Sequence, residues 1–120
     1  LNHSVWGGVG AYRPDLFLFT GDAVYAKNLS GLLAGFERLR ALPGFRQIFG
    51  TPDRPSGVVL DGVYDDHDYV LNDGGKEAPL KAEVQQGFLD FLGAPQDDER
   101  RGRSGVYASA EYGPPGRRLK

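Results

Sequence analysis

Two short apolar segments predict buried strands of a parallel sheet. The first covers residues 15–20 (DLFLFT), between Pro14 and Gly21, and its continuous apolar run predicts a strand buried on both faces. The second covers residues 58–64 (VVLDGVY) and is likewise framed by turn residues. Asp61 interrupts this second run, and a charge in a buried strand requires a polar or charged partner.

Apolar residues at helical spacing predict two helices. The first lies over residues 29–42, between the two strands, and the second lies over residues 80–92, after them. The boundaries are indicated by Asn28 or Ser30 as an N-cap and Pro43-Gly44 as a stop for the first helix, and by Pro79 in the first turn and Gly93 followed by Pro95 at the end of the second.

The rest of the chain is less regular. We expect a polar, mobile loop over 96–104, a third strand over 106–112, where apolar residues alternate weakly, and a turn over 113–116. The order strand–helix–strand–helix–strand indicates an α/β fold with right-handed parallel crossovers.

The composition is ordinary for a soluble globular protein and excludes several kinds of site. The 120 residues are 40% hydrophobic and 25% charged, and 16 acidic against 14 basic side chains give no indication of nucleic-acid binding. There is no cysteine, so disulfides, thiolate ligands and thiol nucleophiles are excluded, and the compartment stays undecided. No apolar run approaches the ~18 residues that a membrane span needs. Walker and G-x-S-x-G motifs are also missing from the sequence.

Polar residues follow both predicted strands directly. Asp22 comes just after the first, and Asp65-Asp66-His67-Asp68 comes just after the second. The carboxyl ends of neighbouring parallel strands meet at one edge, where ligands bind in open α/β sheets. Carboxylates brought together there repel one another unless a cation compensates, and carboxylates mixed with imidazole suit Fe, Zn, Mn or Ca. The alternative is a solvated acidic loop in which His67 is an ordinary surface residue.

These segments together resemble the PhoD-like (alkaline phosphatase D) metallophosphatases of the calcineurin-like metallophosphoesterase superfamily. Residues 13–25 (RPDLFLFTGDAVY) resemble the family segment ending in Gly-Asp-x-x-Tyr, and residues 58–75 (VVLDGVYDDHDYVLNDGG) resemble its Asp-Asp-His-Asp/Glu block followed by Asn. Residues 88–95, 105–109 and 113–117 resemble downstream blocks in the same order. The resemblance implies a partial αββα sandwich of mostly parallel strands, with metal ligands at their C-terminal ends.

The resemblance also implies roles for the residues that match the motifs. Asp22 matches the carboxylate that bridges two metals, and Tyr25 matches a phenolate ligand of ferric iron. Asp66 matches a ligand of the second metal, and His67 matches the histidine that lies beside the scissile phosphate and aids the leaving group. The further residues are Asp65 and Asn72, as additional ligands or groups that orient ligands, and Asp68 and Tyr69, which we expect to orient the loop.

The function implied is hydrolysis of a phosphoester by a metal-activated hydroxide, with two or more Fe, Zn, Mn or Ca ions in the full-length protein. The chain lacks a recognisable upstream ligand set and a later His motif, begins at Leu1 without Met, and ends on a basic stretch. We therefore expect residues 1–120 to be a fragment of a single PhoD-like domain, marginally stable when isolated. The alternative is a catalytically incomplete piece that only binds metal or a partner. A weaker third possibility is an anion-binding module that uses Arg117, Arg118 and Lys120.

Overall fold

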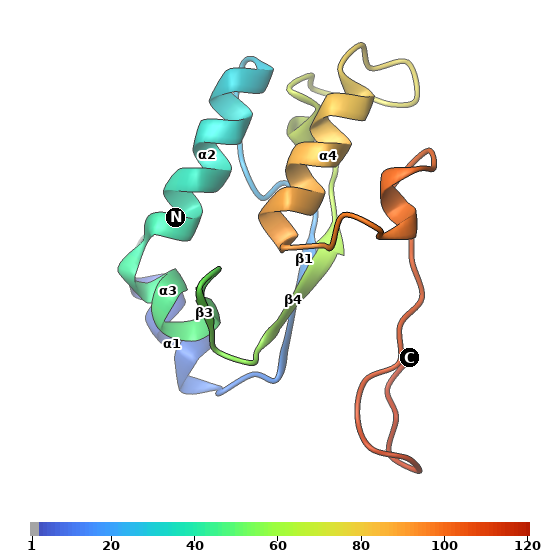
Figure 1. Cartoon of the computed structure of the whole chain (residues 1–120). Coiled ribbons are helices and arrows are strands. Elements are labelled where there is room, and N and C mark those ends of the chain that lie inside the picture. The colour runs from blue at the N-terminus through green and yellow to red at the C-terminus, as the bar shows by residue number, and fades with distance from the viewer. Residues whose placement is uncertain (1–2) are drawn as a thin grey trace.

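The computed structural model describes residues 3–120, and their side chains from Val5 onward, as helices packed on a small parallel sheet (Figure 1). The helices are α1 (His3–Ala11), α2 (Leu29–Ala41), α3 (Pro43–Phe49) and α4 (Lys81–Leu92), with 3₁₀ helices η1 (Asp66–Tyr69) and η2 (Glu99–Arg101). The strands are β1 (Leu16–Thr20), β2 (Gly50–Thr51), β3 (Arg54–Pro55) and β4 (Val59–Val63). None of the helices within this described part has the length and apolar character of a bilayer-spanning segment.

The main sheet consists of β1 and β4, which pair in parallel as predicted. Their register runs from Leu16 opposite Val59 to Thr20 opposite Val63. One face is covered by the helices, but on the other face the side chain of Leu18 is 51% exposed. The prediction that the first strand is buried on both faces is therefore wrong, since no helix covers that face in the described part of the chain. An α/β fold with a small parallel sheet is what the structure shows.

The core lies between the sheet, α2 and α4, and is rich in aromatic side chains. Phe88 of α4 and Leu32 of α2 are completely buried, and the Phe36 ring of α2 stacks on Phe91 of α4 with centroids 4.7 Å apart. Figure 1 shows these two helices side by side. Burial of each such side chain contributes ~1.5–3 kcal/mol, so this contact contributes substantially to stability.

Helices α1 and α3 were not predicted, and their packing explains why they form. The α1 sequence, HSVWGGVGA, contains three glycines, each of which disfavours a helix by ~1 kcal/mol relative to alanine. Trp6 compensates by packing edge-on against Phe45 of α3, with ring centroids 5.1 Å apart. Pro43 ends α2, as expected, but it also occupies the first turn of α3, where its missing N–H is no loss.

Some predicted boundaries are confirmed and others are wrong. The Asn28 side chain caps α2 by accepting a 2.8 Å hydrogen bond from the Gly31 N–H, and Gly93 ends α4 in the left-handed conformation. Pro79 lies before α4, which begins at Lys81, rather than in its first turn. The strand predicted over 106–112 does not form, because within residues 3–120 that segment pairs with nothing beyond a single bridge from its last residue.

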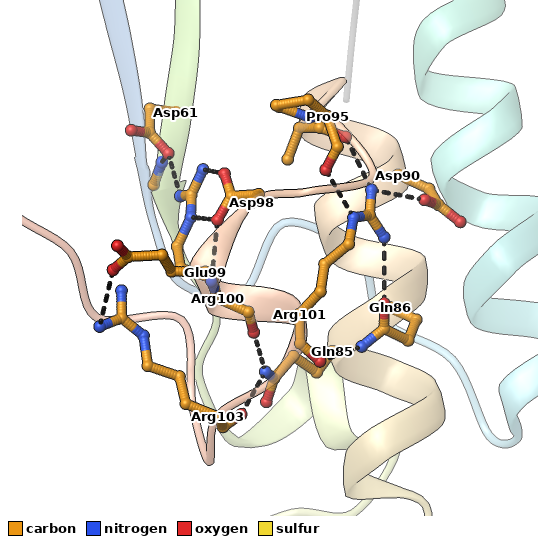
Figure 2. Close-up of polar contacts among 12 residues, drawn as sticks. Asp61, Gln85, Gln86, Asp90, Pro95, Asp98, Glu99, Arg100, Arg101 and Arg103 are labelled. Atoms are coloured by element: carbon orange, nitrogen blue, oxygen red, sulfur yellow. Dashed lines mark hydrogen bonds and ion pairs between the residues drawn. The ribbon is translucent and has the colours of Figure 1, made fainter.

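The second strand is not buried as predicted, since Val59 and Val63 of β4 are exposed, but the half-buried charge of Asp61 still has a partner (Figure 2). The Arg100 guanidinium donates to Asp61 at 2.7 Å and also pairs with Asp98 at 2.8 Å, and the Tyr112 hydroxyl donates to Asp61 at 3.2 Å. The Arg100 guanidinium holds the pKa of Asp98 at about 2. The loop expected over 96–104 therefore contains the short helix η2 and is tied to β4 by the Arg100–Asp61 ion pair.

Gln85 ties the same segment to α4. Its side chain is buried, and its amide donates to the carbonyl oxygens of Arg100 and Arg103, the second at 2.7 Å. Its own carbonyl accepts from the Gly105 N–H at 2.9 Å. A buried amide with every polar atom satisfied specifies one arrangement, so the polar sequence of this segment reflects a fixed network.

Replacing Arg100 by Met is expected to destabilise the fold by ~2 kcal/mol, because Asp61 would keep a largely buried charge without its cation. Urea unfolding measures this. The double variant Arg100→Met/Asp61→Leu should recover much of the loss. Arg118→Met is the matched control, because its ion pair with Glu111 is exposed and worth at most ~0.5 kcal/mol. Equal effects of the two single substitutions would contradict a special role for the Asp61 pair.

Candidate metal centre

The parallel pairing of β1 and β4 places the segments that follow them at one edge of the sheet. Asp22 follows β1, and Asp66 and His67 follow β4. Each of these three side chains offers one ligand atom, and the three atoms all lie within 4.8 Å of one another. The predicted convergence of the two strand ends is therefore confirmed, with Asp22, Asp66 and His67 brought together.

The two segments approach so closely that glycine is required at the junction. A Cβ on Gly21, which has φ +106°, would lie 2.6 Å from the Cβ of Asp65. The next residue, Asp22, has φ 51°, in the left-handed region that non-glycine residues seldom occupy. Such backbone conformations cost of order 1–3 kcal/mol and cluster at functional sites. The strained residue is therefore Asp22 itself, which supplies one carboxylate of the cluster.

Asp68 links the two segments through hydrogen bonds of its buried side chain. Its side chain is completely buried and accepts hydrogen bonds from the Val24 N–H at 3.2 Å and from the Asp65 N–H at 3.1 Å. The first bond crosses between the segments and the second lies within its own. Burial raises the pKa of Asp68, while these backbone bonds oppose that rise. The geometry is that of a residue that orients both loops.

Tyr25 lies across Asp22 and His67. Its hydroxyl donates to Asp22 Oδ2 at 2.9 Å, and its ring packs on the His67 imidazole with centroids 4.4 Å apart. The hydrogen bond to Asp22 raises the pKa of Tyr25, and the negative charge of the same carboxylate adds to the rise. The other oxygen of this carboxylate, Asp22 Oδ1, is buried and has no hydrogen-bond partner within the described residues. A buried carboxylate oxygen without a donor is a place where a cation would compensate.

Asp66 is held in the charged form by backbone donors. Its Oδ1 accepts from the His67 N–H at 2.8 Å, and its Oδ2 accepts from the Asp73 N–H at 2.5 Å. The Asp73 hydrogen bond is the main reason that the pKa of Asp66 lies below its ordinary value. A carboxylate that stays ionised and oriented is suited to ligate a metal ion.

Asp65 and Asn72 lie beside the cluster and make local contacts. Asp65 caps η1, accepting from the Asp66 N–H at 2.8 Å, and forms a reciprocal capping box with Asp68. Asn72 donates to Asp73 Oδ2 at 2.7 Å, next to the residue whose N–H contacts Asp66. Asp65 therefore orients the backbone of the loop through its hydrogen bonds. The capping role was not predicted, although Asp-x-x-Asp after a strand is similar to a capping-box pattern.

The site carries acidic charge with no basic side chain to balance it. Within the described residues, no lysine or arginine forms an ion pair with Asp22, Asp65, Asp66 or Asp68, whereas the acids near η2 are paired with arginines. Carboxylates gathered this closely favour binding of a cation.

The chain matches no protein-family model, no curated protein and no solved structure.

Proposed function

We propose that this chain carries part of a metal-dependent phosphoester-hydrolysing site of the PhoD-like type, on a partial αββα sandwich. The observation that carries the proposal is the cluster of Asp22, Asp66 and His67, whose ligand atoms lie within 4.8 Å of one another. The residues come from two separate motifs that follow neighbouring parallel strands. The Gly-Asp-x-x-Tyr and Asp-Asp-His-Asp motifs that supply them are specific to the family when they occur together.

The donor set fits a metal ion. Two carboxylates and an imidazole suit Fe, Zn or Mn, and a more oxygen-rich set would suit Ca. The unpartnered Asp22 Oδ1 is a position for a cation, and Asp66 is held ionised. Tyr25 is a further ligand in this proposal, but its hydrogen bond to Asp22 favours the neutral phenol until a cation takes the place of its proton.

A bound metal ion would polarise the phosphoryl oxygens and lower the pKa of water. The chain's own residues then have separate tasks. Asp22 and Asp66 would hold the ion. In the enzyme His67, although near enough to be a third ligand, would instead contact the substrate and donate a hydrogen bond or proton to the leaving oxygen. Tyr25 restricts the rotation of the His67 ring through their 4.4 Å stacking contact. No side chain has to act as a nucleophile, in agreement with the lack of cysteine.

The test is metal binding by the purified chain. We expect elemental analysis to find stoichiometric iron, zinc, manganese or calcium, and the double variant Asp22→Asn/Asp66→Asn to lose it. Asp53→Asn/Asp97→Asn is the matched control, since it removes the same charge from two exposed acids away from the site and should leave binding intact. A folded wild-type chain that binds no metal, or a double variant that binds as well as wild type, would contradict the site.

The second candidate is a catalytically incomplete piece that binds metal without turnover. It is favoured by the number of clustered groups, because three ligand groups are enough for one ion, whereas two-metal hydrolysis needs more. Assays of the metal-loaded chain with p-nitrophenyl phosphate and bis(p-nitrophenyl) phosphate separate the two. Hydrolysis that is lost in His67→Gln supports the enzyme, and stoichiometric metal without hydrolysis supports the incomplete piece.

A further inference from the structure

A cavity of about 470 Å³ adjoins the candidate metal centre on the side of α2. Part of its wall is formed by Asp22 and Tyr25, which belong to the centre. Its remaining wall combines apolar side chains with one cation. The residues that shape it are Asp22, Val24, Tyr25, Arg38, Leu39 and Leu42.

Arg38 is the basic residue of this wall, and its charge, which lies in the last turn of α2, has no specific partner in the described residues. It is exposed, and it forms no hydrogen bond or ion pair with any residue that the structure describes. Arg40, two positions later in α2, differs: its guanidinium donates to the carbonyl oxygens of Phe91 and Asp90, the latter at 3.1 Å, and so caps the end of α4. The positive charge of Arg38 is therefore available to a ligand in the cavity.

The apolar part of the wall is held in place by close packing. A Cβ on Gly35 of α2 would lie 2.3 Å from Val24 Cγ1, so the absence of a side chain there lets Val24 seat directly against the helix. Leu39 is buried and Leu42 partly buried on the same side. Hydrophobic walls with one or two polar groups are typical of small-molecule sites, in which the polar groups fix orientation.

We propose that this cavity receives the alcohol portion of the phosphoester, and that this portion is apolar and carries an anionic group that pairs with Arg38. The proposal rests on the proposed function, because the phosphoryl group would lie at Asp22, Asp66 and His67. The Asp22 carboxylate in the wall repels an anion unless a metal is bound, while the Arg38 guanidinium attracts one and matches a carboxylate or phosphate in geometry. Arg38 is then a specificity-determining residue.

The first experiment tests the cavity without metal. Benzoate, an apolar ring with one carboxylate, is titrated into ¹⁵N-labelled chain in EDTA and followed by NMR. We expect amide shifts confined to residues 23–25 and 35–42, and an affinity that falls about fivefold or more in Arg38→Gln. Arg13→Gln, which removes another exposed arginine outside this cavity, is the control and should bind as wild type. Shifts elsewhere, no binding, or equal binding by Arg38→Gln would overturn the proposal.

The second experiment separates this inference from the proposed function. In the metal-loaded chain, 4-carboxyphenylphosphonate should bind about fivefold more tightly than phenylphosphonate, and Arg38→Gln should remove that preference. If both bind equally to wild type, the role of Arg38 is wrong while the metal centre stands. If the chain binds no metal, the proposed function fails, and the benzoate titration alone decides whether the cavity is an anion site.

Discussion

Replacing Gly62 by Ala is expected to destabilise the fold by at least ~3 kcal/mol, enough to unfold much of a small domain. Gly62 lies in β4 with φ +152°, a conformation that L side chains seldom adopt. An added Cβ would also lie 2.3 Å from the Phe19 carbonyl oxygen and 2.7 Å from its nitrogen. Both are backbone atoms of β1 in the sheet, so neither can move without separating the two strands that carry the site.

Gly57→Ala is the matched control for this substitution. Gly57 also has positive φ, at +90°, but an added Cβ would have nothing within 4 Å. The Gly57→Ala substitution should therefore cost only the free energy of holding alanine at positive φ, ~1–2 kcal/mol. Urea unfolding followed by circular dichroism measures both variants. If the two substitutions cost the same, the close approach of β4 to β1 contributes nothing beyond backbone conformation.

The elements that could be predicted from the sequence are those in which local pattern and packing agree. The apolar spacing of α2 and α4 marks the faces that meet in the core, and both β1 and β4 were placed to within two residues. Helix α1 could not be predicted because its glycines disfavour a helix, and the contacts that stabilise it, those of Trp6 with Phe45 and Phe49, are distant in the sequence. For residues 106–112 the local pattern favoured a strand that does not form, because an alternating segment becomes a strand only if a neighbouring strand pairs with it.

The residues of the site also divide into those that local pattern predicts and those that depend on distant contacts. The convergence of Asp22 with Asp66 and His67 was predictable, because neighbouring parallel strands bring the segments after them to one edge. The contribution of Asp68 depends on a hydrogen bond to Val24, 44 positions earlier, which no local pattern indicates. No sequence pattern distinguishes Arg38. It is one of two similar arginines two positions apart, and only the packing of α2 shows that Arg40 caps α4 while Arg38 has no partner in the described residues.

Asp68→Asn is expected to lower metal affinity by about 10- to 100-fold, the effect typical of removing a group that orients metal ligands. The amide has the same shape as the carboxylate but only one acceptor oxygen, while two backbone N–H groups, those of Val24 and Asp65, point at the side chain. Whichever way the amide turns, one N–H loses its acceptor and faces an NH₂ group. The fold should lose ~1–3 kcal/mol as well.

A loss of affinity could follow from lower stability alone, so Asp61→Asn is the control. Asp61 also accepts a backbone hydrogen bond, from the Gly62 N–H at 2.9 Å, and loses its charge pairing with Arg100 when neutralised. We expect a comparable loss of stability in urea unfolding but unchanged metal affinity by calorimetric titration, since Asp61 contacts neither of the loops that follow the strands. If Asp61→Asn weakens metal binding as much as Asp68→Asn, the hydrogen bonds by which Asp68 joins the two loops have no specific role in metal binding. If instead only Asp68→Asn does so, with NMR shifts extending across residues 21–28 as well as 65–73, the two motifs work as one site because a buried carboxylate joins them.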